Sequence, residues 1–330
     1  MFSRRTPTDF SENLIARALR VRARPYIDLT QTNPTLAGLS PSEDELRAAF
    51  GGGGASRYEP SPRGMLSARE AVCAQYARRG VAVDPGRIFL TASTSEAYSY
   101  LFKLLCDPGD CVLVPEPSYP LFDHLADLEG VRRKSYGRVE TPAGPGSLDV
   151  GSVVGGLETG ARALLLVNPN NPTGTYVKRE EFLALLPALD PASHAVISDE
   201  VFFAFSLRES RSPRLGVAAA APDAKVLTFS LSGLSKSCAL PQVKLGWILL
   251  GGPTERVALA AERLELIADT YLSVSTPVQL ALPDLFRIGR FAAARIQDRL
   301  AENLRTAVRL FRAADAANGL RPLWPEGGWT

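Results

Sequence analysis

Histidine is almost absent from this sequence: His124 and His194 are the only two among 330 residues. A metal site built from several histidines is therefore excluded, and we expect no metal centre. Cysteine is also scarce, and the four residues lie far apart without a CxxC pair, at Cys73, Cys106, Cys111 and Cys238. That spacing is typical of a reduced cytoplasmic protein rather than of a disulfide scaffold, so we expect a cytoplasmic location.

Neither sign of charge is in clear excess: 37 Lys and Arg face 35 Asp and Glu, a net charge of +2. Such a balance gives no reason to expect nucleic acid or an anionic membrane as a partner. No apolar run approaches the roughly 18 residues that would cross a bilayer. The N-terminus, MFSRRTPTDF, has no apolar segment after its arginines, so no secretory signal is expected.

The chain does have length and apolar content. With 330 residues, 45% of them hydrophobic, it can bury a large core, and its length predicts about two domains. From residue 87 onward, short β-rich apolar runs alternate with helical stretches. We expect strands at 87–91, 111–114, 163–167, 195–198, 226–230 and 245–250. This alternation predicts an α/β fold with a mainly parallel sheet and helices on both faces.

Helices are expected at 10–24, 43–50, 65–79, 179–189, 254–268, 277–285 and 290–318. The four glycines at 51–54 lack GxGxxG spacing and follow no strand, so they indicate a flexible connection rather than a dinucleotide site. The last stretch, LWPEGGWT, is interpreted as the opening of a hairpin.

Polar clusters follow the expected strands at their carboxyl ends. They are Ser93-Thr94-Ser95, Tyr119, Asn171, Asp199 and Lys236. Ligands of parallel sheets bind beyond the carboxyl ends of the strands. Five clusters supplied by five strands therefore predict a single site on one rim.

Each cluster suits one part of a phosphorylated pyridine aldehyde, and each also has an ordinary structural explanation. The helix start at Ser93 can bind a phosphate or simply cap its helix. Tyr119 can lie on an aromatic ring or pack against the protein. Asn171, in NPNNPTG, can donate to a ring oxygen or complete a turn. Asp199, if buried, needs a cationic partner such as a pyridinium N–H, or else it caps a helix.

Lys236 lies in SLSGLSK, between two apolar strands and near Ser230, Ser232 and Ser235. In partly desolvated surroundings the pKa of a lysine falls and its amine becomes a usable nucleophile. The serines and Lys244 can meanwhile bind an anion. A lysine in a polar loop is more often simply solvated, so these residues alone leave both explanations open.

Several stretches together resemble fold type I pyridoxal-phosphate enzymes, in particular the class I/II aminotransferases. They are TASTSEA, DPGDCVLVPEPSYP, NPNNPTG, SDEVF, and SLSGLSK followed by KLGW. They occur in the family's order and at its spacing, over about residues 25–330. The resemblance implies a seven-stranded type of sheet in a large domain, 46–288. It also implies a small domain, formed by 1–45 and 289–330, that is incomplete at its C-terminus.

The resemblance also implies roles around the cofactor ring. Lys236 would form the Schiff base with pyridoxal 5'-phosphate and then move a proton of the substrate. Asp199 would pair with the pyridine nitrogen and Asn171 with the ring hydroxyl. Tyr119 would stack on the ring.

Other residues would hold the cofactor phosphate. The resemblance assigns this role to Thr94, Ser95, Ser235 and Lys244. Tyr58 matches a tyrosine that reaches the phosphate of the neighbouring subunit, so a homodimer is expected.

The implied activity is that of an aminotransferase, or transaminase, of amino acid metabolism that exchanges an amino group between an amino acid and a 2-oxo acid. One alternative is a β-lyase on the same fold, since fold and cofactor do not fix the reaction. Another is a shortened, non-catalytic protein that only binds the cofactor or a partner. YLSVSTP lacks the arginine of dicarboxylate-specific relatives, which weighs against aspartate and glutamate as the best substrates.

Three features depart from the family pattern. Phe202 replaces a tyrosine that donates to the ring oxygen in many relatives. Loss of such a bond, about 1.5–3 kcal/mol, should raise the pKa of the internal aldimine by about one to two units. Lys244 replaces an arginine and lacks its bidentate fork. The chain stops at Thr330, before the arginine that binds the substrate α-carboxylate in relatives, so we expect substrate binding to be weakened unless another residue serves.

Overall fold

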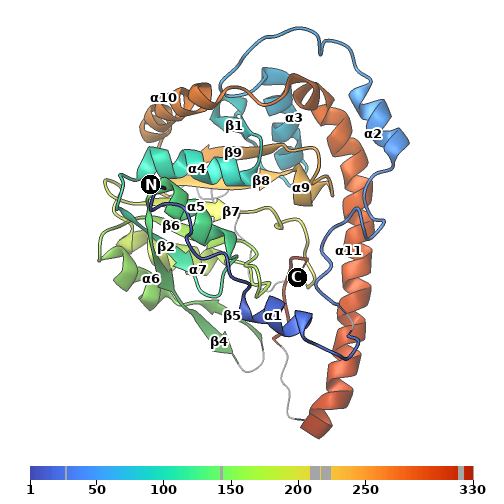
Figure 1. Ribbon diagram of the computed structural model, residues 1–330. Coiled ribbons are helices and arrows are strands. Elements are labelled where there is room, and N and C mark those ends of the chain that lie inside the picture. The colour runs from blue at the N-terminus through green and yellow to red at the C-terminus, as the bar shows by residue number, and fades with distance from the viewer. Residues whose placement is uncertain (27, 142–143, 209–215, 217–223, 319–322, 330) are drawn as a thin grey trace.

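The computed structural model describes residues 1–330 except 27, 142–143, 209–215, 217–223, 319–322 and 330 (Figure 1). Its strands are β1 (Ile88–Thr91), β2 (Cys111–Pro115), β3 (Arg132–Tyr136), β4 (Arg138–Thr141), β5 (Gly144–Leu148), β6 (Ala161–Val167), β7 (Ala195–Asp199), β8 (Leu227–Gly233) and β9 (Gly246–Gly251). A seven-stranded sheet has the order β1-β9-β8-β7-β6-β2-β3, and β4 and β5 form a separate pair. Only β9 runs against the other strands of this sheet. The predicted α/β fold with a mainly parallel sheet is therefore confirmed.

Helices cover both faces of the sheet. They are α1 (Leu14–Arg20), α2 (Glu43–Phe50), α3 (Leu66–Ala77), α4 (Thr94–Leu105), α5 (Leu121–Glu129), α6 (Val150–Leu157), α7 (Arg179–Leu185), α9 (Leu234–Ser237), α10 (Thr254–Tyr271) and α11 (Thr276–Asn318). Side chains alternate along each strand, so Ile197 of β7 joins the core under α4, α5 and α10, and Val196 joins the core under α6 and α7. A third cluster fills the space between β1, β9, α3 and α11.

All six strands expected from the sequence are present. The structure adds the pair β4 and β5 and, in the main sheet, β3. Its sequence, RRKSY, is polar and mostly exposed because β3 is an edge strand, so it carries no apolar signal. Helix α6 was also not predicted, because its glycine-rich sequence VGSVVGGL resembles a loop. The predicted division into two domains stays a prediction.

The sequence predicts two helices, 277–285 and 290–318, where the structure has the single helix α11. Pro283 lies inside it, and apolar residues on both sides of the expected break are buried, such as Leu285 before it and Ala292 after it. Gly289 lies so close to α9 that a Cβ there would be 2.3 Å from Cβ of Cys238. Tight packing against α9 thus keeps the helix continuous where local sequence favours a break.

The last described residues, 323–329, pair with the body of the protein instead of opening a hairpin. Gly327 forms an antiparallel bridge with Ser206. The amides of Glu326 and Gly327 both donate to the carbonyl of Gly174, at 2.9 and 3.0 Å. The segment therefore returns from the end of α11 to the sheet (Figure 1).

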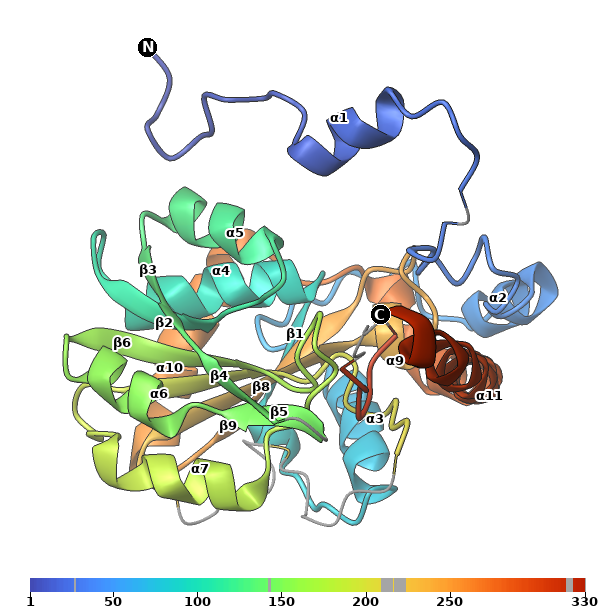
Figure 2. The same ribbon diagram turned by 90° about the horizontal axis from the view of Figure 1, so that it is seen from below.

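The N-terminal arm stands apart from the layers of the fold (Figure 2). Helix α1 is shorter than the expected 10–24 and has no buried residue. The side chain of Arg5 donates to the carbonyl of Leu128 at 3.3 Å, which ties the start of the arm to the end of α5. Within the described part of the chain, no helix is both long and apolar enough to cross a membrane.

Candidate active site

The carboxyl ends of β1, β2, β6, β7 and β8 meet at one edge of the sheet, because these strands run in the same direction. The register sets Val167 of β6 opposite Asp199 of β7, and Asp199 opposite Leu231 of β8. Each polar cluster predicted from the sequence follows one of these five strands. The structure therefore gathers the clusters on a common rim.

Two glycines let the pieces of this rim approach one another. A Cβ on Gly246 would lie 3.1 Å from both the carbonyl oxygen of Ser232 and the carbonyl carbon of Ser93. A Cβ on Gly233 would lie 2.9 Å from the carbonyl oxygen of Leu245. Side chains would force these segments apart. Their absence lets the starts of α4 and α9 converge beside the end of β8.

Lys236, on the single turn α9, points its amine into aromatic surroundings. Its Nζ lies 5.5 Å from the ring centre of Phe202 and 5.2 Å from that of Trp329. Within the described part of the chain, this amine makes no hydrogen bond or ion pair. Burial lowers the pKa of Lys236, and the charge of Asp199 partly opposes that shift. The amine is thus more easily deprotonated, as a nucleophile requires.

Asp199 is 9% exposed and is held by two hydrogen bonds. Its Oδ2 accepts from the hydroxyl of Tyr98 at 3.1 Å, and its Oδ1 accepts from the amide of Val201 at 3.1 Å. Burial raises the pKa of Asp199 from 3.8 to about 6, although both hydrogen bonds and the charge of Lys236 favour the ionised form. At neutral pH the carboxylate is therefore a buried anion that suits a cationic ligand group.

Tyr98 was missed by the sequence analysis. It is 2% exposed, and its ring meets Phe122 edge-on with centroids 5.1 Å apart. Its hydroxyl orients the Asp199 carboxylate. A signal did exist: Tyr98 lies four residues after Thr94, and on a helix that spacing puts a side chain on the same face.

Trp329 was also missed, and it reaches the site through contacts distant in sequence. The Glu326 carboxylate, in a residue only 8% exposed, accepts from the amide of Tyr176 at 3.0 Å and pairs with Lys178 at 2.5 Å. The amide of Gly328 donates to the carbonyl of Phe205 at 2.9 Å. These contacts hold the Trp329 ring over Lys236. No local pattern in the sequence indicates them.

The Trp329 ring packs against two phenylalanines. Its centroid lies 5.6 Å from that of Phe202 and 5.1 Å from that of Phe205, both in edge-on geometry. Its Nε1 is buried without a hydrogen-bond acceptor among the described residues. Phe202 itself is 8% exposed and offers no hydroxyl to the site.

Tyr119 and Asn171 lie in the loops after β2 and β6. Tyr119 is 46% exposed and meets Phe122 edge-on at 6.1 Å, so much of its ring is open to a ligand. Asn171 is half-buried. Its neighbour Asn170 donates from its side-chain amide to the carbonyl of Pro117 at 3.2 Å, which joins the two loops.

The start of α4 has the properties of an anion site. The hydroxyl of Ser93 caps the helix by accepting from the amide of Glu96 at 3.1 Å. Thr94 and Ser95 are the first two residues of the helix, where amides lack intrahelical acceptors. The helix dipole adds a favourable potential for a phosphate. Ser235, half-buried on α9, lies next to Lys236.

Two residues predicted to hold the cofactor phosphate, Lys244 and Tyr58, are exposed to solvent. Lys244 is exposed in the loop before β9, with a left-handed backbone (φ 61°). Tyr58 is 76% exposed and makes no hydrogen bond or ring contact within the described chain. Among the described residues, no hydrogen bond, ion pair or ring contact joins Lys244 or Tyr58 to the other site residues, and their roles stay predictions.

These residues fit a phosphorylated aldehyde with a basic aromatic ring. An amine without a polar partner suits the aldehyde, a buried carboxylate suits the ring nitrogen, and a helix start suits the phosphate. The described residues contain no group of three or more His, Cys, Asp or Glu that could bind a metal ion.

Comparisons with known proteins show what this chain is similar to. The sequence model for aminotransferase class I and II matches residues 24–328. The glutamate-pyruvate aminotransferase AlaA of Haemophilus influenzae is 27% identical over 221 residues, 67% of this chain and 53% of that protein. The tyrosine aminotransferase of Bos taurus is 26% identical over 317 residues, 94% of this chain and 69% of that one. The chain spans about half the length of AlaA and of the alanine aminotransferases it matches.

Solved structures show the same fold. An alanine aminotransferase from Pyrococcus furiosus superposes with a TM-score of 0.79 at 23% identity, covering 94% of this chain and 77% of that one. An aspartate aminotransferase double mutant of Thermus thermophilus gives 0.77 at 22% identity, covering 99% and 83%. Since the family match runs through the segments that carry Asn171, Asp199 and Lys236, the chain belongs to the family of class I and II aminotransferases.

Proposed function

We propose that this protein is a pyridoxal-phosphate-dependent aminotransferase that moves an amino group between an amino acid and a 2-oxo acid. The observation that carries the proposal is the Lys236 amine. It makes no hydrogen bond or ion pair among the described residues, and burial lowers its pKa while the charge of the buried Asp199 carboxylate opposes that shift. The bound cofactor would supply an electron sink for charge that develops at the substrate α-carbon. Membership of the family supports the proposal.

The chain's own residues divide the remaining work. Lys236 would hold the cofactor covalently and, once displaced by substrate, its amine would take the proton from the substrate α-carbon. The lowered pKa of Lys236 favours the neutral amine that this step needs. Asp199, oriented by Tyr98, would keep the ring nitrogen protonated. Asn171 and Tyr119 would orient the ring from the two loops that Asn170 joins.

Covalent labelling tests the assignment of Lys236. We expect borohydride reduction of the cofactor-loaded protein, followed by peptide mapping, to place the cofactor on Lys236 alone. Lys236→Ala should abolish the label and the visible absorbance, while Lys225→Ala, altering a lysine before β8, should keep both. Label on another lysine would overturn the assignment.

The reaction class needs a separate measurement. An aminotransferase mixed with one amino acid and no acceptor releases about one oxo acid per subunit and no ammonia, because its two half-reactions are linked. Continued release of pyruvate and ammonia would instead indicate the β-lyase. Label on Lys236 with no reaction towards any amino acid would indicate a protein that only binds the cofactor.

The raised pKa of Asp199 makes a prediction for the cofactor-free protein. Between pH 3.8 and about 6 the folded state binds more protons than the unfolded state, so stability falls as the pH rises. A pKa shift of about two units corresponds to about 3 kcal/mol in the free energy of unfolding. Urea unfolding measures the free energy of unfolding at pH 4 and pH 7.5. The wild type should lose more stability between these pH values than Asp199→Asn does. Equal pH dependence of the two proteins would contradict it.

A cavity next to the site is proposed to receive the substrate. It has a volume of about 320 Å³ and lies between the loop 28–39 and α11. Leu39, Ile296 and Leu300 give it apolar walls, and Trp329 lines it as well. Because Trp329 also lies over Lys236, its ring would form the wall between the cavity and the reacting amine.

Trp329→Ala should therefore change substrate binding more than chemistry. We expect KM for the best amino donor to rise at least tenfold, the scale of lost pocket contacts, with a smaller fall in kcat. Trp324→Ala is the matched control, since Trp324 packs edge-on against Phe311, away from Lys236. Equal effects of the two substitutions on KM would exclude this role for Trp329.

The exposed arm supports the proposed homodimer. Leu14 is 80% exposed, Ile15 is 73% and Phe10 is 86%, although all three are large and apolar. An apolar helix held away from its own core is explained if it packs on a second copy of the chain. Tyr58, also exposed, would then reach the partner's site.

Light scattering after size exclusion tests this assembly. The wild type should elute as a dimer, and a Leu14→Asp/Ile15→Asp variant should shift towards monomer because two charges would enter the interface. Leu310→Asp, a change at an exposed leucine of α11, should leave the dimer intact. A dimeric arm variant would show that the arm is not part of the interface.

A further inference from the structure

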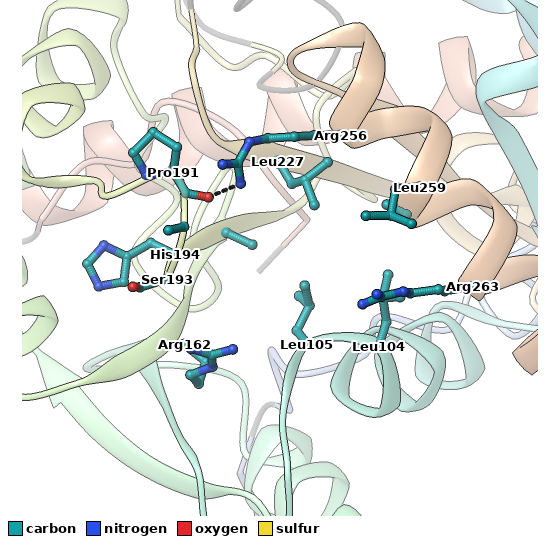
Figure 3. Close-up of a pocket in the computed structure, with 13 residues that line it drawn as sticks. Leu104, Leu105, Arg162, Pro191, Ser193, His194, Leu227, Arg256, Leu259 and Arg263 are labelled. Atoms are coloured by element: carbon teal, nitrogen blue, oxygen red, sulfur yellow. Dashed lines mark hydrogen bonds between the residues drawn. The ribbon is translucent and has the colours of Figure 1, made fainter.

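A second cavity lies at the starts of β7 and β8, at the opposite edge of the sheet from Lys236. Figure 3 shows the residues that line it. It has a volume of about 280 Å³, near the lower end of the range for small-molecule sites. Ala195 and Leu227, which begin β7 and β8, lie in its wall, whereas the proposed active site follows the ends of those strands. The length of β7 separates the two by roughly 13 Å.

Three arginines surround this cavity, which we call the arginine pocket. Arg162 comes from β6, and Arg256 and Arg263 come from α10 (Figure 3). Arg256 donates to the carbonyl of Pro191, which is a neutral acceptor. Arg263 makes no hydrogen bond or ion pair with the rest of the described chain.

Two acidic side chains lie near these arginines. Asp110 approaches Arg162 with an Oδ2–Nε distance of 3.6 Å. Asp190 accepts hydrogen bonds inside its own turn, from the hydroxyl of Ser193 and the amide of Ala192. These two carboxylates offset only part of the positive charge of the three arginines that line the pocket, so the pocket suits a small anion.

His194 completes the polar wall without adding charge near neutral pH. Its Nδ1 accepts from the amide of Asp190 at 2.9 Å. Burial lowers the pKa of His194, and the nearby charge of Arg162 acts in the same direction, while Asp190 opposes both. The histidine is therefore neutral at pH 7 and above, and the arginines alone supply the positive charge.

The floor of the arginine pocket is apolar. Leu104 and Leu105 at the end of α4 and Leu227 at the start of β8 form it, and Leu259 of α10 lies on its wall. Leu259 is 50% exposed, which leaves apolar surface beside the guanidinium groups. A ligand that fits both features needs an anionic head and an apolar body.

We propose that the arginine pocket binds a small organic monocarboxylate with an apolar body. A carboxylate matches the planar fork of a guanidinium and can accept two hydrogen bonds from it. The apolar body would lie on Leu105 and Leu227. The site is separate from Lys236 and does not depend on the proposed transamination.

Isothermal titration of the cofactor-loaded protein with three probes tests whether binding needs both a carboxylate and an apolar chain. Hexanoate has both, acetate lacks the apolar chain, and hexanamide lacks the negative charge. We expect hexanoate to bind at least about tenfold more tightly than either. Acetate loses the burial of several methylenes and hexanamide loses one charged contact, and each loss is large enough to lower the affinity about tenfold. Equal affinity for hexanoate and hexanamide, or no binding of hexanoate, would overturn the proposal.

Variants locate the binding. Arg256→Gln/Arg263→Gln should weaken hexanoate binding at least about tenfold, the scale of a lost charged contact, without lowering Tm, since both side chains are exposed. Arg305→Gln/Arg309→Gln, which removes two exposed arginines of α11, is the matched control for charge. Lys236→Ala should still bind hexanoate, and adding Arg263→Gln to that variant should weaken the binding. Binding lost only in Lys236→Ala would assign hexanoate to the active site and refute the arginine pocket.

Discussion

The buried carboxylate of Asp199 is the constraint on which the site depends. A carboxylate at this depth is costly unless donors and a cation stabilise it. Tyr98 and the amide of Val201 supply two donors, and the raised pKa shows that they do not fully compensate the burial. Part of the cost of burying the charged carboxylate is therefore not offset, which is why a protonated ring nitrogen would suit this position.

Lys236 presents the complementary problem of a cation that makes no hydrogen bond or ion pair with the residues that the structure describes. Its amine faces the rings of Phe202 and Trp329, which attract a cation weakly but accept no conventional hydrogen bond. Burial therefore shifts Lys236 towards its neutral form, as it shifts Asp199 towards its own neutral form. Two groups displaced from their usual protonation states, one at the end of β7 and the other on α9 directly after β8, are typical of a functional site rather than of a structural ion pair.

Much of the fold could be predicted from the sequence, because β-rich apolar runs and their spacing are local properties. The strands that carry the site were found in this way, and so was the rim, since parallel strands must end on the same side. The sequence did not predict the edge strand RRKSY or the glycine-rich α6, because neither has the usual apolar pattern of its element. The continuous α11 escaped because the packing of Gly289 on Cys238 overrides the local preference for a break.

The sequence by itself determined which chemical groups follow which strand, and hence that Ser95, Asn171, Asp199 and Lys236 share one rim. Only the tertiary structure decided what surrounds them. Trp329 reaches Lys236 because Glu326 pairs with Lys178, nearly 150 residues earlier in the chain, and no local pattern encodes such a contact. The pKa values of Asp199 and Lys236 likewise depend on burial, which arises only when distant segments pack together and exclude water.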